Sequence, residues 1–155
     1  MTDVILAAAV FGGDQAVKRF MEKKLNFHEE KPVCNGFMTL TKHHNSGSAG
    51  NCFQGKKDLL IAISSAILGG VCVLLAMIKK RQGKVYLRLA YSLILGGGFS
   101  NLYDRLTLGY VVDYFRFSKM PKPIRKLVFN FADIAVFLGG FLVLLGNIGF
   151  SEEVS

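Results

Sequence analysis

The chain has 155 residues, of which 51% are hydrophobic and 19% are charged, and its mean hydropathy is +0.36. Ordinary soluble domains carry about 25% charged residues, so this composition argues against a soluble protein, and its apolar content excludes a disordered chain. The net charge of +8 would suit a nucleic-acid binder, but the apolar content does not, so we expect a small integral membrane protein with no nucleic-acid partner.

Four apolar stretches are predicted to cross a membrane as helices, because about 20 apolar residues span a hydrocarbon core of about 30 Å. They are residues 4–20, 59–78, 85–103 and 131–150. The second stretch has no charged residue, whereas the third contains Arg88 and the fourth Asp133. The first is the least apolar of the four. We interpret it as a retained span, because a signal peptide would begin with basic residues.

The polar segment 21–57 separates the first two stretches and is broken by Pro32 and several glycines. Residues 36–41 alternate enough between apolar and polar side chains to predict a short strand. We therefore expect this segment to fold on the membrane surface.

The basic residues give conflicting information on orientation. Four spans place both termini and the turn 79–88 on one side of the membrane, and that turn carries five basic residues and no acidic one. The polar segments of the other side carry 13 basic residues. Counted plainly, the positive-inside rule places these larger segments in the cytoplasm, whereas the family resemblance described below gives the opposite orientation.

Polar residues gather near one end of the predicted bundle, where burial in lipid is costly and a function is the first hypothesis. Asp14 and Lys18 share a helix face and form either a self-neutralising ion pair or a pair that orients another group. Asn101 and Arg105 share a face at the end of the third stretch, where a helix cap and a snorkelling arginine are the simpler interpretation. The preceding glycines 96–98 would let another helix approach closely.

Two aspartates lie next to apolar residues, where burying a charged carboxylate is energetically unfavourable. Asp113 follows two valines and precedes Tyr-Phe, and Asp133 begins an apolar run just after Asn130, a candidate helix cap. The topology brings both acids to one membrane face, where close carboxylates share a proton. The charged member could then deprotonate water while the protonated member polarises a carbonyl, as in aspartic peptidases. Paired acids would also suit a proton- or cation-coupled transporter.

Other chemistries have little support in the sequence. There is no P-loop and no HExxH motif. The three histidines, Cys34 and Cys52 lie in the polar segment without the spacing of a zinc site. We therefore expect no metal and no cofactor. Cys34 and Cys52 could form a disulfide if the segment is extracytoplasmic.

At these residues the chain resembles bacterial lipoprotein signal peptidase, or signal peptidase II, over nearly its whole length. NLYDRLTLGYVVDYF (101–115) and FNFAD (129–133) resemble the two signature blocks of the family, each of which holds a catalytic aspartate. DQAVK (14–18) resembles the acid–lysine pair of the first helix. HNSGSAGNCF (44–53) resembles, more loosely, an Asn–x–Gly–Ala–Ala–Phe loop.

The resemblance implies a catalytic dyad of Asp113 and Asp133. The other implied site residues are Asn101 and Arg105, which would hold substrate or shape the pocket, Asn130 beside the dyad, Asn45 on the substrate, and Asp14 and Lys18 in support. Asp104 would be structural and would pair with a nearby base. The sequence departs from the family where Ser100 replaces the usual glycine, and additional residues after Asn45 allow Asn51 to take its role.

The fold class that follows is an all-α integral membrane protein with four transmembrane helices and a small extracytoplasmic β-containing cradle. The resemblance implies a bacterial plasma or inner membrane location with both termini cytoplasmic. It implies partners that are diacylglyceryl-modified prolipoproteins and membrane lipids, with cleavage before the lipidated cysteine. One chain holds every candidate residue, so we expect a monomer. A coupled transporter and a non-enzymatic assembly factor remain the alternatives.

Overall fold

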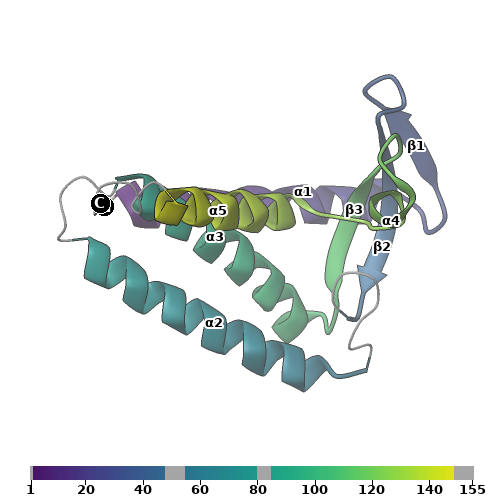
Figure 1. Cartoon of the computed structure of the whole chain (residues 1–155). Helices are drawn as coiled ribbons and strands as arrows, with labels where there is room; N and C mark the ends of the chain where they lie inside the picture. The colour runs from purple at the N-terminus through teal and green to yellow at the C-terminus, as the bar shows by residue number, and fades with distance from the viewer. Residues whose placement is uncertain (1, 48–54, 80–84, 149–155) are drawn as a thin grey trace.

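The computed structural model describes residues 2–47, 55–79 and 85–148, so Asn51 and Cys52 lie outside the described residues. Its helices are α1 (Thr2–Lys24), α2 (Lys57–Ile78), α3 (Val85–Thr107), the short α4 (Lys122–Arg125) and α5 (Phe131–Ile148). Its strands are β1 (Glu30–Val33), β2 (Met38–Asn45) and β3 (Val111–Phe117). The sheet lies across one end of the long helices (Figure 1).

Helix α3 is central and packs against α1, α2 and α5. The run Gly96–Gly98 allows this, because an added Cβ would meet a different helix at each position. At the first glycine it would meet Ala7 of α1, at the second Ala132 of α5, and at the third Leu68 of α2. The predicted close approach at these glycines is therefore confirmed, and it involves three neighbours.

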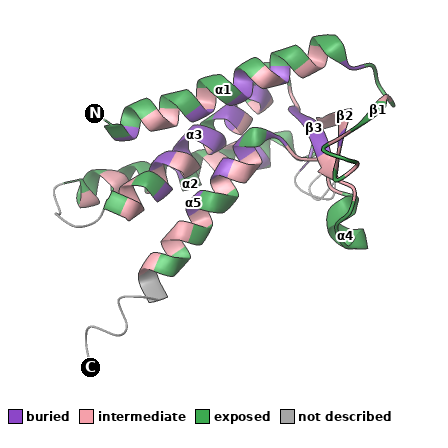
Figure 2. Cartoon of the chain, turned by 90° about the horizontal axis from the view of Figure 1, so that it is seen from above, coloured by how far each residue is buried: buried purple, intermediate pink, exposed green. Residues whose placement is uncertain are grey.

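Helices occupy all four predicted apolar stretches, although their membrane crossing stays a prediction. Among the described helices, only α2 is both long and apolar enough to cross a membrane by length and composition. The apolar part of α5, Phe131–Gly146, is shorter. Large apolar side chains nevertheless face outward, and Phe137 of α5 is 79% exposed. Figure 2 shows the buried residues where the helices meet and exposed residues on their outer faces.

The β-containing cradle is a three-stranded antiparallel sheet in the order β1-β2-β3. The predicted strand 36–41 overlaps β2, which begins at Met38 and continues to Asn45. Asn45 therefore ends a strand, whereas the sequence placed it in a loop. Asp113 lies within β3, opposite His43 of β2. A register shift between Leu40 and His43 sets this pairing.

Candidate active site

Asp113 and Asp133 line the same cavity, which has a volume of about 470 Å³. Asp113 is near the start of β3, and Asp133 is in the first turn of α5. The cavity walls come from α2, α3, α5, β2, β3 and residues 127–129. The other polar side chains that line it are Asn45, Ser64, Asn101 and Arg105. The fold thus brings the two predicted aspartates from separate elements to one cavity.

Asn130 joins the two aspartates and also caps α5. Its Oδ1 accepts a hydrogen bond from the Asp133 backbone N–H (2.8 Å), and its own N–H donates to Asp133 Oδ2 (3.0 Å). This reciprocal pattern is a capping box. It leaves the amide nitrogen free to donate to Asp113 Oδ1 at 2.7 Å. Asn130 therefore caps the helix and also contacts both aspartates, whereas its part in the chemistry stays a prediction.

Two further amides complete the surroundings of the carboxylates. Asn45 Nδ2 donates to Asp113 Oδ2 (3.0 Å), and Asn101 Nδ2 donates to Asp133 Oδ1 (2.8 Å). Each of the four carboxylate oxygens therefore accepts one N–H hydrogen bond. Such bonds orient both carboxyl groups and stabilise negative charge on them.

Lys18 fixes the orientation of the Asn101 amide. Its side chain is 2% exposed, and its ammonium nitrogen lies 2.8 Å from both Asp14 Oδ2 and Asp104 Oδ2, so the i,i+4 ion pair is present. It also donates to Asn101 Oδ1 at 2.8 Å. Because an ammonium group can only donate hydrogen bonds, the Asn101 oxygen must face Lys18, and its NH₂ group must face Asp133.

Asp14 and Asp104 connect this network to the surrounding elements. Asp14 accepts hydrogen bonds from Ser100 Oγ (2.6 Å) and from the Ala132 backbone N–H (3.0 Å), so it links α1 to α3 and α5. Asp104 accepts from Gln15 Nε2 (2.7 Å) and from the Val112 N–H (3.2 Å). The pairing of Asp104 with a nearby base, expected from the sequence, is the contact with Lys18.

Three members of the network were not predicted as site residues from the sequence. They are Gln15, Ser100 and Tyr114, whose hydroxyl accepts from the Phe131 N–H (2.9 Å) and reaches Asp14 Oδ1 (3.4 Å). The sequence did mark position 100 as unusual, because Ser100 stands where the family usually has glycine. No feature of the sequence indicated a role for Gln15, since a glutamine inside a helix commonly faces solvent.

Arg105 borders the cavity from α3 and reaches the segment after β2. Its guanidinium donates to the Gly47 carbonyl at 3.2 Å and to the Asn101 carbonyl at 3.3 Å. Arg105 therefore ties the end of α3 to the described end of the polar segment, immediately before residues 48–54. The predicted contact of this arginine with substrate stays a prediction.

The environment of Asp113 favours its protonated form. Burial, followed by the negative charge of Asp133, raises the pKa of Asp113 to about 7. The hydrogen bonds from Asn45 and Asn130 oppose this shift. Since Asp113 is only 2% exposed, a large fraction of its carboxyl groups keep their proton near neutral pH.

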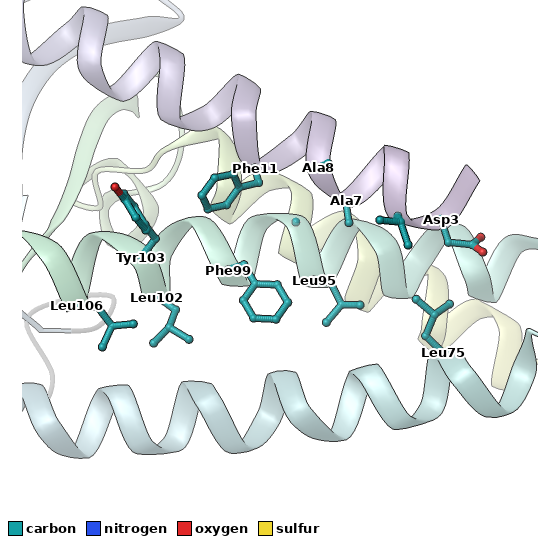
Figure 3. Close-up of a pocket in the computed structure, with 12 residues that line it drawn as sticks. Asp3, Ala7, Ala8, Phe11, Leu75, Leu95, Phe99, Leu102, Tyr103 and Leu106 are labelled. Atoms are coloured by element: carbon teal, nitrogen blue, oxygen red, sulfur yellow. The ribbon is translucent and has the colours of Figure 1, made fainter. Parts of the chain in front are cut away.

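A second cavity lies away from the two aspartates. It has a volume of about 580 Å³ and lies between α1, α2 and α3 (Figure 3). Its lining is almost entirely apolar, and Phe11 and Tyr103 meet there edge to face, with ring centroids 5.8 Å apart. The paired carboxylates therefore lie in the first cavity and not in this one. Within residues 2–47, 55–79 and 85–148, no three His, Cys, Asp or Glu side chains form a group suited to a metal ion.

Solved structures have the same fold. One, described as a bacterial membrane enzyme, superposes with a TM-score of 0.86 at 23% identity and covers 99% of this chain and 92% of its own. Another with the same description gives a TM-score of 0.79 at 24% identity, with 94% and 91% covered. At these identities the likeness concerns the fold alone.

Sequence comparison is more specific. A lipoprotein signal peptidase of Brevibacillus brevis is 33% identical over 141 residues, covering 91% of each chain. Another, of Caldanaerobacter subterraneus, is 35% identical over 153 residues, covering 96% of this chain and 99% of that protein. The family model described as Signal peptidase (SPase) II matches residues 6–148. Because that match and both relatives extend over nearly the whole chain, the chain belongs to the signal peptidase II family.

Proposed function

We propose that this membrane peptidase removes signal peptides from diacylglyceryl-modified prolipoproteins and cleaves before the lipidated cysteine. The observation that carries the proposal is the pair Asp113 and Asp133, held in one cavity by three asparagine side chains. The name lipoprotein signal peptidase, shared by the relatives, supports the substrate class.

The two aspartates have different roles in this mechanism. Asp133 is the base, because it lies in the first turn of α5, where the helix dipole and the Asn130 backbone N–H stabilise its negative charge. Asp113 is the acid, because burial and its neighbour's charge let it keep a proton. Water held between the carboxyl groups attacks the scissile carbonyl, and Asp133 takes the water proton while Asp113 polarises the carbonyl oxygen. When the C–N bond breaks, the leaving nitrogen takes the proton from Asp133, and Asp113 is protonated as at the start.

The walls of the cavity suit a lipidated peptide. Ile67 of α2 and Val136 of α5 provide apolar surface, and Asn45 and Arg105 provide polar groups on the side of the sheet. The acyl chains and the apolar part of the signal peptide would lie between α2 and α5. The peptide bond would then lie beside the dyad, and no metal, cofactor or covalent enzyme intermediate is required.

The proposed topology follows from the same arrangement. The four long helices cross a bacterial cell membrane, both termini are cytoplasmic, and the sheet and dyad are at the extracytoplasmic face. A monomer suffices, because one chain holds all the proposed catalytic groups. A proton-coupled transporter is disfavoured, because Asp14, Asp113 and Asp133 gather at one end of the bundle and do not form a relay through its depth.

The decisive test is cleavage of a synthetic diacylglyceryl peptide by the purified protein in detergent. Asp113→Asn and Asp133→Asn should each reduce kcat by roughly 10²–10⁴-fold, the usual contribution of a general acid or base. Circular dichroism should show that both variants stay helical. The unlipidated peptide is the substrate control and should be cleaved poorly. Near-normal turnover by either variant would exclude the dyad.

A further inference from the structure

A cationic turn, residues 119–126, connects β3 to α5 and includes α4. All eight residues are exposed. Four of them are basic, namely Lys119, Lys122, Arg125 and Lys126, and none is acidic. Met120 and Ile124 lie among these cations, and each is 38% exposed. The turn therefore presents positive charge together with apolar side chains.

The neighbouring hairpin extends the apolar part of this surface. The Ser118 N–H donates to the Phe37 carbonyl at 2.9 Å, and Lys119 Nζ donates to the Asn35 carbonyl at 3.1 Å. These bonds hold the turn between β1 and β2 against the start of the cationic turn. Phe37 is itself 40% exposed. A phenylalanine from a second segment thus adds to the apolar surface.

The glutamates of the polar segment 21–57 do not neutralise these cations. Glu22 pairs with Lys42, Glu29 with Lys31, and Glu30 with Arg116. Among the ion pairs of the described part of the chain, none includes a basic residue of the cationic turn. Its charge is therefore available to an external anion.

The location of the turn suggests the partner. The sheet lies across the end of the bundle in Figure 1, and α4 is set off to the side of the helices in Figure 2. The turn ends close before α5 begins at Phe131. In Figure 1, α4 lies at the level of the sheet, beyond the start of α5. On the proposed topology the turn therefore lies just outside the point where α5 enters the membrane. Lipid headgroups occupy this height.

We propose that the cationic turn binds the anionic phospholipid headgroups of the extracytoplasmic leaflet. Clustered cations next to partly exposed apolar side chains match such a surface, because charge attracts the headgroups and the apolar groups enter the acyl boundary. The bound turn would also restrain β3, because Phe129, just beyond it, exchanges backbone hydrogen bonds with Phe115. The inference uses the proposed topology but not the proposed chemistry.

The test uses the absence of tryptophan from the sequence. Ile124→Trp supplies a single fluorophore in the turn, and the full-length variant is reconstituted in phosphatidylcholine vesicles with or without phosphatidylglycerol. Phosphatidylglycerol should shift the emission to the blue and increase quenching by brominated acyl chains. Adding Lys122→Gln with Lys126→Gln in this background should abolish the difference. The matched control, Lys23→Gln with Lys24→Gln, removes two exposed lysines from the end of α1 and should retain it.

Three results would overturn the proposal. Emission could be the same with and without phosphatidylglycerol, both lysine pairs could abolish the difference equally, or the shift could require the lipopeptide substrate. The last result would indicate that the turn binds substrate. Peptidase activity in detergent should be unchanged in both lysine double variants. Failure of the lipid proposal is thus distinguishable from failure of the proposed function.

Discussion

Asn130 shows how one side chain can serve the fold and the proposed chemistry through different atoms. Its oxygen caps α5, and its nitrogen donates to Asp113. We expect Asn130→Ser to retain the cap but lose the second bond, since a serine hydroxyl can accept from the N3 position. Activity should fall about 10-fold or more, while the melting temperature in detergent stays close to that of the parent.

The matched variant Asn130→Ala should lose both functions. Its stability should decrease by about 1 kcal/mol, the usual cost of losing a cap. If Asn130→Ser retained full activity, the bond to Asp113 would have no role in turnover. Equal destabilisation of the two variants would show that serine does not replace the cap.

The shifted pKa of Asp113 predicts a pH dependence of turnover. Its acid role requires the proton, so kcat should fall as pH rises through about 7. The hydrogen bond from Asn45 lowers this pKa, so Asn45→Ala should raise the pKa and move the alkaline limb to higher pH. The measurement is kcat against pH for both proteins with saturating lipopeptide. An alkaline limb that stays in place or moves to lower pH contradicts the assignment.

The sequence predicted the charged residues of the site better than its neutral ones. An acid or a lysine in an apolar stretch is costly, so Asp14, Lys18 and Asp133 were evident without a structure. Gln15 and Tyr114 carry no such penalty, and their roles depend on which helix faces them. That information is tertiary and is not contained in local periodicity.

At the scale of elements, close helix approach is the feature most open to test. A Cβ on Gly139 of α5 would lie 2.6 Å from the Ala90 carbonyl oxygen of α3, whereas one on Gly140 would meet nothing within 4 Å. Gly139→Ala should therefore separate α3 from α5 and move Asn101 away from Asp133. We expect a lower melting temperature and a reduced kcat.

Gly140→Ala is the matched control on the next residue. It should retain activity and be equally or more stable, because alanine favours a helix over glycine by about 1 kcal/mol. Thermal unfolding in detergent, followed by circular dichroism, compares the two variants. Similar behaviour of both would show that the contact at Gly139 does not determine the helix spacing.

The strands were less predictable than the helices. β1 contains Pro32, which argues against a strand but is tolerated at a sheet edge, where β1 lies. β3 begins with five consecutive buried residues, Val111–Phe115, so it lacks the alternation of a half-exposed strand. The predicted strand overlaps β2, where burial alternates over the first four residues only, with Thr39 and Thr41 buried.

For the whole molecule, orientation is the principal open prediction, because the plain charge count and the family resemblance disagree. A reporter that is active only in the cytoplasm, fused to the C terminus, should be active on the proposed topology. A matched fusion at residues 48–54, within the polar segment 21–57, should be inactive. The reverse pattern would support the charge count and place the proposed active site in the cytoplasm.

Among the described helices, hydropathy identifies only α2 as a span. Two of the others, α1 and α3, carry charged side chains that pair with each other across the helix interface. Asp3 of α1 forms an ion pair with Arg88 of α3 (2.8 Å), and Lys18 of α1 pairs with Asp104 of α3. A hydropathy average taken over one helix at a time treats each of these charged residues as unfavourable in the membrane. The fold removes much of that cost by pairing them.

The same pairing has a consequence for biosynthesis. On the proposed topology, α1 leaves the ribosome first, and its partner residues follow much later, since Gln15 and Ser100 are 85 positions apart. When α3 enters the bilayer it brings Arg88 and Asp104, whose partners already lie in α1. On this topology we therefore expect the first helix to stabilise the third as it inserts, by pairing with its charged side chains. A nascent chain without α1 would present the membrane quality-control machinery with unpaired charges in α3.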